Sequence, residues 1–233
     1  MMAKVVVVLI MAHGIMGWGG NQTGKPQDQM KVYYNGVQPF LKDYVSKKRP
    51  DVELVMVAPT VPRADKVENR GKALRQAIED ELKRRPAGTR VHILAHSMGG
   101  LDSRWVIAQE GMAEKIASLT TIATPHRGTS LGDLAYDELP IILPAGQVLD
   151  KLYGIRRTIW RHFPFTRMAD PDLLGFFNNM LIGFDSTPEQ MYDGVYALTL
   201  KGAGQFNQEL AEKEKAVRAR KDKPVTYFAY GGR

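Results

Sequence analysis

The stretch VHILAHSMGG, at residues 91–100, predicts a strand that runs into a serine and a helix that leaves it. This is the setting of a nucleophile elbow, a strained turn that exposes a serine at the end of a strand. The positions two residues before and two residues after the serine must be small, and Ala95 and Gly99 occupy them. The segment therefore predicts that Ser97 is a nucleophile, and an ordinary serine at a helix N-terminus is the alternative.

The flanking sequence continues the alternation of strands and helices. Apolar runs predict strands at residues 5–11, 53–57, 91–95, 119–123 and 225–230, and helical spacing predicts helices at 34–48, 66–84 and 99–109. Asp65 and Glu68 have the spacing of a capping box at the start of the second helix. Alternating strands and helices imply an α/β fold, a mostly parallel sheet with helices on both faces.

An insert at about 131–195 breaks this pattern. It stays apolar but shows no strand rhythm, and large aromatic residues are frequent in it: Trp160, Phe163, Phe165, Phe176, Phe177 and Phe184. We expect a helical excursion from the sheet rather than an independent domain. Residues 1–233 are therefore expected to form a single domain.

The composition excludes several classes of protein. A chain of 233 residues that is 44% hydrophobic can bury a large core, and this content excludes disorder. The absence of cysteine excludes disulfide scaffolds and thiolate metal sites. The net charge is +7, but the sequence has no basic stripe interleaved with aromatic residues, so no nucleic-acid partner is expected. Weak contact with an anionic membrane surface is the remaining electrostatic expectation.

Targeting, metal and cofactor motifs are also missing from the sequence. The apolar run Val5–Ala12 is short for a signal peptide and no cleavage-like site follows it, so a cytoplasmic protein is expected. No apolar run approaches the ~20 residues of a membrane span. No metal-ligand spacing, phosphate-binding loop or dinucleotide motif is found, and we expect neither a metal nor a cofactor.

A second segment, His13-Gly14, follows the first predicted strand. A glycine at this point lets the backbone turn so that an N–H points into the site. Together with the amide of the residue after Ser97, it can stabilise a developing oxyanion. The predicted donors are the backbone N–H groups of Ile15 and Met98, and a plain glycine-rich turn is the alternative.

A third segment, Thr-Pro-His-Arg-Gly-Thr at residues 124–129, follows the fourth predicted strand, where open α/β sheets bind ligands. With His13-Gly14 and the run AHSMGGLDSR at 95–104, it resembles the triacylglycerol lipases of the α/β-hydrolase superfamily, especially the bacterial true lipases and related fungal groups. The resemblance covers nearly the whole chain and is weakest across the insert. It implies that the segment at 131–195 is a cap or lid over an acyl pocket.

The resemblance implies a serine ester hydrolase that cleaves acylglycerols or other apolar esters through an acyl-enzyme on Ser97. The residues that would shape the site are His13, Gly14, His96, Gly99 and His126. Two alternatives stay open. One is a deacylase or acyltransferase that uses the same serine on a lipid-linked substrate. The other is a lipid- or protein-binding protein that has lost the catalytic relay.

The relay itself is incomplete in this sequence. A serine hydroxyl needs a histidine base and an acid that orients it, and in this fold both follow the serine. The family places them after the cap, whereas here the last histidine is His162 and the sequence ends at Arg233. His126 is the one histidine expected near the right edge of the sheet. Its family equivalent is not the base, and a substitute base at His126 is the minor alternative. We therefore expect a C-terminally truncated member of the family, inactive as it stands.

Overall fold

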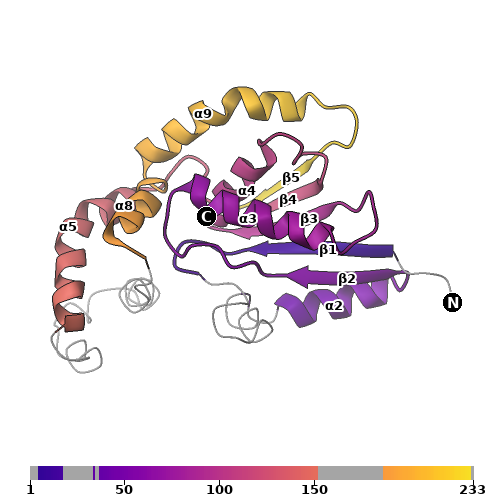
Figure 1. The fold of residues 1–233 in the computed structure, drawn as a ribbon, viewed down its shortest axis with the longest axis horizontal. Coiled ribbons are helices and arrows are strands. Elements are labelled where there is room, and N and C mark those ends of the chain that lie inside the picture. The colour runs from indigo at the N-terminus through magenta and orange to yellow at the C-terminus, as the bar shows by residue number, and fades with distance from the viewer. Residues whose placement is uncertain (1–4, 18–33, 35–36, 152–185, 232–233) are drawn as a thin grey trace.

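The computed structural model describes residues 5–17, 34, 37–151 and 186–231 of the chain, with side chains undescribed over 141–151. One five-stranded sheet runs through it, in the order β2-β1-β3-β4-β5, and all neighbouring strands are parallel. The strands are β1 (Val5–Ala12), β2 (Val52–Val57), β3 (Val91–His96), β4 (Ile116–Ile122) and β5 (Thr226–Tyr230). Their carboxyl ends share one edge of the sheet (Figure 1). The predicted α/β sheet is confirmed.

Helices lie on both faces of this sheet (Figure 1). They are α2 (Val37–Lys48), α3 (Val67–Leu82), α4 (Gly99–Ile107), α5 (Ser130–Lys151), α8 (Pro188–Tyr196) and α9 (Leu200–Arg218). Neighbouring residues of β1 show how the faces divide. Ile10 packs in a cluster with residues of α3 and α4, whereas Met11 packs in a cluster with residues of α2. Both side chains are fully buried, so the continuously apolar strand serves two cores, as expected for a parallel sheet.

The insert is helical where it is described. Helix α5 begins at Ser130, and α8 occupies Pro188–Tyr196 with Met191, Gly194 and Val195 buried. The aromatic residues from Trp160 to Phe184 lie outside the described residues. No helix in the described ranges is both long enough and apolar enough to cross a membrane.

The predicted capping box at Asp65 is wrong. The residue that caps α3 is Lys66, and no side chain bonds to the amides of the first turn. Asp65 instead accepts through Oδ1 from the Lys66 amide at 2.7 Å and from the Asn69 side chain at 2.9 Å, and through Oδ2 from Gln190 Nε2 of α8 at 3.1 Å. A capping box does form at Thr187, whose side chain accepts from the Gln190 amide while the Gln190 side chain bonds back to the Thr187 amide.

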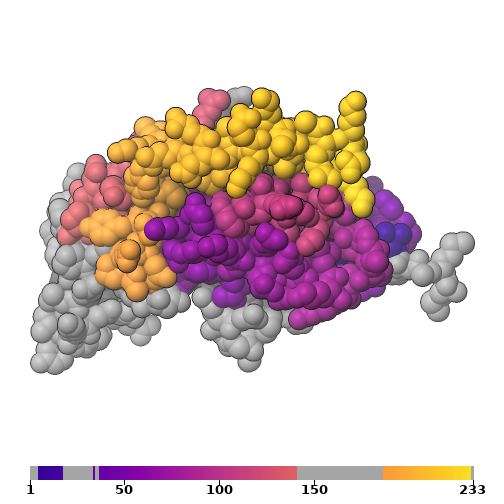
Figure 2. Space-filling model, turned by 45° about the horizontal axis from the view of Figure 1, so that its top comes forward, coloured from indigo at the N-terminus to yellow at the C-terminus, as the bar shows by residue number. Residues whose placement is uncertain are grey.

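Two helices differ from the sequence prediction in extent or existence. The helix expected from residue 34 begins at Val37, because the hydroxyl of Tyr34 is anchored to the carbonyl of Ala12 at 2.6 Å. Helix α9 was not predicted, although Ala203, Phe206 and Leu210 form a buried face at helical spacing. In Figure 2 the orange and yellow residues of α9 lie along the magenta residues, which come from the middle of the chain. The missed helix therefore covers the side of the sheet on which α4 lies.

Candidate active site

Ser97 stands in the turn between β3 and α4, at the carboxyl edge of the sheet. Its φ of 52° lies in the left-handed region, which non-glycine residues rarely adopt. The Ser97 amide donates to the carbonyl of Ile122 at 2.9 Å, and its own carbonyl accepts from the Gly100 amide at 3.0 Å. Backbone strain of this kind persists only where the surroundings hold it, and it clusters at functional sites.

The small residues on either side of this serine are required by close packing. A Cβ on Gly99 would lie 2.6 Å from the carbonyl oxygen of Ala12 and 2.7 Å from that of His13. Ala95 is completely buried in the sheet core. The elbow thus lies directly against the end of β1, and this contact brings the His13-Gly14 segment beside Ser97.

The turn after β1 is tight. The Gly17 amide donates to the Gly14 carbonyl at 3.2 Å, Met16 has a φ of 60°, and the Met16 amide donates to the carbonyl of Arg63 at 2.7 Å. The amides of Ile15 and Met98 donate to no partner within the described part of the chain. Two backbone N–H groups near Ser97 are thus available to an oxyanion, although their role stays a prediction.

His13 supports this turn as a neutral side chain. It is 1% exposed, with Nδ1 2.9 Å from the Gly14 carbonyl and Nε2 3.5 Å from the Val61 amide. A carbonyl only accepts and an amide only donates, so the proton belongs on Nδ1. Burial, together with the charge of the nearby Arg70, lowers the pKa of His13 to about 3. Its role in this structure is to hold the turn.

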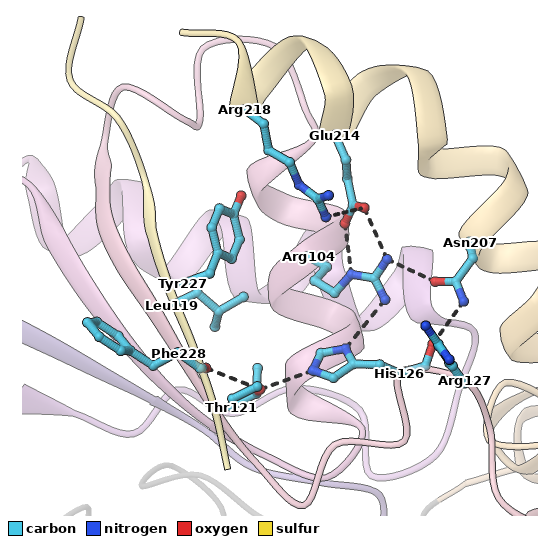
Figure 3. A pocket seen from close by; sticks show the side chains of 11 residues that line it. Arg104, Leu119, Thr121, His126, Arg127, Asn207, Glu214, Arg218, Tyr227 and Phe228 are labelled. Atoms are coloured by element: carbon cyan, nitrogen blue, oxygen red, sulfur yellow. Dashed lines mark hydrogen bonds and ion pairs between the residues drawn. The ribbon is translucent and has the colours of Figure 1, made fainter. Parts of the chain in front are cut away.

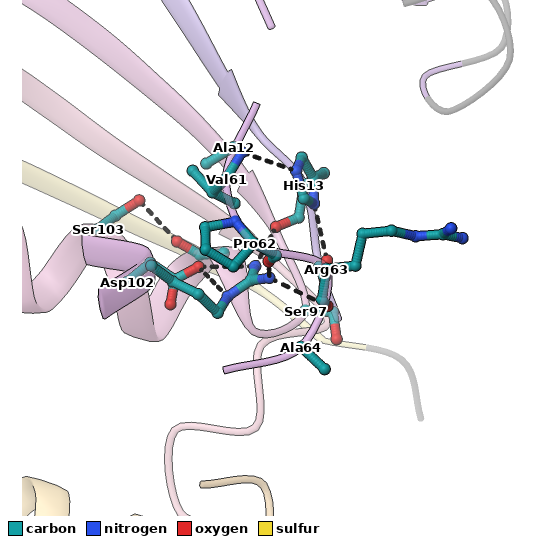
Figure 4. Close-up of polar contacts among 12 residues, drawn as sticks. Ala12, His13, Val61, Pro62, Arg63, Ala64, Ser97, Asp102 and Ser103 are labelled. Atoms are coloured by element: carbon teal, nitrogen blue, oxygen red, sulfur yellow. Dashed lines mark hydrogen bonds and ion pairs between the residues drawn. The ribbon is translucent and has the colours of Figure 1, made fainter. Parts of the chain in front are cut away.

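Beneath the turn lies a buried ion pair that the sequence analysis missed. Arg70 of α3 is fully buried, and its Nε and Nη2 bond to Asp102 Oδ2 of α4 at 2.9 and 2.8 Å. The guanidinium also donates to the carbonyls of Pro62, Arg63 and His13 (Figure 4). A single side chain thereby joins two helices, a loop and the end of β1. The signal in the sequence is an arginine on the apolar face of the predicted helix over 66–84.

The carboxyl of Asp102 is the less well stabilised member of this pair. Burial raises the pKa of its carboxyl to about 6, although Arg70 favours the charged form. Only one carboxylate oxygen is bonded, because Asp102 Oδ1 is buried without a hydrogen-bond partner. The buried charge of Asp102 therefore depends on the Arg70 guanidinium for its stabilisation.

A cavity of about 250 Å³ opens beside Ser97. Its lining comes from the ends of β1, β3 and β4 and from α5 and α8: Ile15, Ser97, Ala123, Pro125, Thr129, Leu131, Gly132, Ala135, Val195 and Leu198. The only polar side chains among them are two hydroxyls, and no charged or imidazole side chain is present in this described lining. The cavity therefore suits an uncharged, apolar group.

The other predicted histidines do not line this cavity. His126 faces a separate cavity of about 390 Å³, where its Nε2 lies 3.0 Å from Thr121 Oγ1 and its Nδ1 3.4 Å from Arg104 Nη1 (Figure 3). Burial, and then Arg104, lowers the pKa of His126. Burial also lowers the pKa of His96, which ends β3 next to Ser97. His162 lies outside the described residues.

The second cavity is built around another ion pair that the sequence analysis missed. Arg104 of α4 bonds to Glu214 of α9 at 2.7 Å and to Asn207 at 2.9 Å (Figure 3). Its guanidinium also stacks over the ring of Phe206, 5.1 Å from the centroid. These contacts attach α9 to the rest of the fold. No group of three or more metal-ligating side chains occurs in the described ranges.

Comparison with known proteins agrees with this fold. Residues 63–137, which include α3, β3, α4 and β4, match the family described as PGAP1-like alpha/beta domain. The lipase BlEst2 of Bacillus licheniformis aligns over 96% of this chain and 64% of its own, with a TM-score of 0.55 and 16% identity. Staphylococcus hyicus lipase aligns over 89% of this chain and 64% of its own, with a TM-score of 0.51 and 18% identity. At these identities the likeness is one of fold.

Sequence relatives make the likeness more specific. Triacylglycerol lipase 2 of Saccharomyces cerevisiae is 36% identical over 109 residues, or 45% of this chain and 31% of the yeast protein. A triacylglycerol lipase of Pseudarthrobacter phenanthrenivorans is 30% identical over 141 residues, or 56% of this chain and 37% of that protein. The chain thus spans about a third of the length of these two relatives. The chain has the fold of these lipase structures, and the sequence relatives that it matches are triacylglycerol lipases.

Proposed function

We propose that this protein hydrolyses apolar carboxylic esters through an acyl-enzyme on Ser97. The observation that carries the proposal is the strained φ of 52° at Ser97, on the wall of an apolar cavity. The uncharged lining supports an ester with an aliphatic acyl group, such as an acylglycerol. The names of the sequence relatives, triacylglycerol lipases, support the same substrate class.

The proposed chemistry has two half-reactions. Ser97 Oγ attacks the ester carbonyl, its proton passes to a general base, and the carbonyl oxygen becomes an oxyanion that the Ile15 and Met98 amides stabilise. Collapse of the tetrahedral intermediate releases the alcohol and leaves the acyl group on Ser97. Water, deprotonated by the same base, then attacks the acyl-enzyme and releases the acid. The base is not among the described residues that line the cavity, so the experiment must also locate it.

The first test is labelling with a fluorophosphonate, which reacts with activated serines. We expect the label on the peptide that contains Ser97, and we expect Ser97→Ala to abolish it. The assay is run on residues 1–233 and on a form that carries any residues its gene encodes after Arg233. Labelling of the longer form alone would place the base beyond Arg233. Absence of label from both forms contradicts the proposal and favours a binding protein.

The second test separates the substrate classes. p-Nitrophenyl esters, triglycerides, acyl thioesters and a lipid-linked acyl substrate are compared with the form that labels. We expect cleavage of the oxygen esters, with loss of at least ~1000-fold in kcat for Ser97→Ala. Preferential turnover of the thioester or the lipid-linked substrate would identify a deacylase or acyltransferase that uses the same serine.

A further inference from the structure

We infer that the hydroxyl of Thr124 positions the oxyanion donor at Met98, by holding the peptide group that joins Ser97 to Met98. The inference rests on the proposed function of Ser97 and adds a positioning residue to it. Thr124 follows β4 and is not one of the residues that line the cavity beside Ser97.

The central contact is a hydrogen bond between distant parts of the chain. Thr124 Oγ1 donates to the carbonyl oxygen of Ser97 at 2.8 Å. That carbonyl and the Met98 N–H are the two ends of one planar peptide group. A bond that fixes the direction of the C=O therefore fixes the direction of the N–H. It also polarises the peptide group, which makes the N–H a stronger donor.

The strand beside the elbow holds the other side of Ser97 as well. The Ser97 amide donates to the carbonyl of Ile122, the last residue of β4, at 2.9 Å. Ile122 and Thr124 thus hold the two peptide groups that flank the serine. The Ser97 carbonyl has one further bond, from the Gly100 amide at 3.0 Å, which belongs to the first turn of α4 and does not tie it to β4.

Three features keep Thr124 in place. Ala123 before it has a φ of 49°, which turns the chain sharply at the end of β4. Pro125 after it restricts Thr124 to extended backbone conformations. Gly100 leaves room for it, because a Cβ at Gly100 would collide with Oγ1, Cγ2 and Cβ of Thr124. Because it has no Cβ, the second glycine of the Ser-Met-Gly-Gly run therefore leaves the space that the Thr124 side chain fills.

This arrangement predicts an effect on the chemical step rather than on substrate binding. An oxyanion donor is used only after attack has begun, so a misdirected Met98 amide lowers kcat and leaves KM unchanged. Loss of a donor itself costs about 100- to 1000-fold in kcat, and a donor left in place but poorly aligned costs less, on the order of tenfold.

The test compares Thr124→Val, which has the same shape without the hydroxyl, with Thr124→Ser, which keeps it. Thr89→Val is the matched control. It removes a threonine hydroxyl that donates to the carbonyl of Pro86 at 2.7 Å, before the amino end of β3 and away from the site. Crystal structures give the orientation of the Ser97–Met98 peptide group. Kinetics with a p-nitrophenyl ester and the rate of fluorophosphonate labelling give its effect on reactivity.

We expect Thr124→Val to rotate the Ser97–Met98 peptide group and to lower kcat about tenfold at constant KM, while Thr124→Ser and Thr89→Val match the parent. An unrotated peptide group in Thr124→Val overturns the inference, whatever the rates are. An equal loss in Thr124→Ser also overturns it, because the hydroxyl would then not be the cause. If no form reacts at Ser97, the proposed function fails, while the crystal structures still decide whether Thr124 holds the peptide group.

Discussion

Arg70→Met is the substitution that most directly tests how the site is supported. Methionine keeps a long side chain but removes the guanidinium, which is fully buried. The change leaves Asp102, 1% exposed, without its counter-ion, and it removes the donors to the carbonyls of Pro62 and His13. We expect a loss of stability and a looser turn at the end of β1.

The magnitude follows from burial. Removing one partner of a buried ion pair costs about 3–5 kcal/mol, because the remaining group must either stay charged without a counter-ion or change its protonation state. The pKa of Asp102 is already raised to about 6 with Arg70 in contact, so without Arg70 its carboxyl will hold a proton at neutral pH. A domain is typically stable by about 5–15 kcal/mol, so the expected loss is a large fraction of the total.

Urea unfolding followed by circular dichroism measures this loss. Arg70→Met is compared with Asp102→Leu, with the double variant, and with Arg49→Met as the control. Arg49 makes an equally close pair with Asp51, at 2.9 and 2.7 Å, but both side chains are more than half exposed. We expect no measurable change in the midpoint for Arg49→Met. The double variant should lose less than the sum of the two single variants, because neither charge is left unpaired.

Two results would refute this reasoning. One is an Arg70→Met variant within about 1 kcal/mol of the parent, since the pair would then contribute no more than a surface pair. The other is strict additivity in the double variant, since Arg70 and Asp102 would then be energetically independent despite their contact.

Three further substitutions test the site. Ser97→Gly removes the side chain from a φ of 52°, so it should raise the unfolding free energy by about 1 kcal/mol while abolishing fluorophosphonate labelling. Gly100→Ala should destabilise the protein and displace Thr124, as urea unfolding and a crystal structure would show, because its Cβ collides with that side chain. His13→Gln tests the depressed pKa of about 3. Neutral His13 stabilises the fold above its unfolded pKa of about 6.5, and this contribution falls as the pH drops towards 3. Between pH 7 and 4.5, urea unfolding should therefore show that the parent loses about 3 kcal/mol more unfolding free energy than His13→Gln does.

The elbow could be predicted from sequence because its determinants are local. Ala95, Ser97 and Gly99 lie within five residues, and a strained turn between a strand and a helix restricts which residues can flank it. The same locality explains the agreement for the strands, since a buried parallel strand is marked by its own apolar run.

The supports of the site could not be predicted, because each depends on two segments that only the fold brings together. Arg70 and Asp102 are 32 residues apart, and Thr124 reaches Ser97 across 27 residues. The capping box at Asp65 failed partly for the same reason. Its Oδ2 takes a hydrogen bond from Gln190, 125 residues away, which a local pattern cannot reveal, while its Oδ1 is bonded to the neighbouring Lys66 amide and Asn69 side chain.

The strained residues show how the sheet and the site depend on each other. Met16, Ser97 and Ala123, all with positive φ, follow β1, β3 and β4, and all three lie at the carboxyl edge of the sheet. In each case the amide of the strained residue is bonded to a carbonyl of an adjacent segment, from Arg63, Ile122 and Tyr230 respectively. The last of these carbonyls belongs to Tyr230, the final residue of β5, although no residue of β5 lines the cavity beside Ser97. Strain that needs external support will relax when the support is lost. The outer strand is therefore part of what shapes the site, because it holds Ala123, which in turn places Thr124 against the serine.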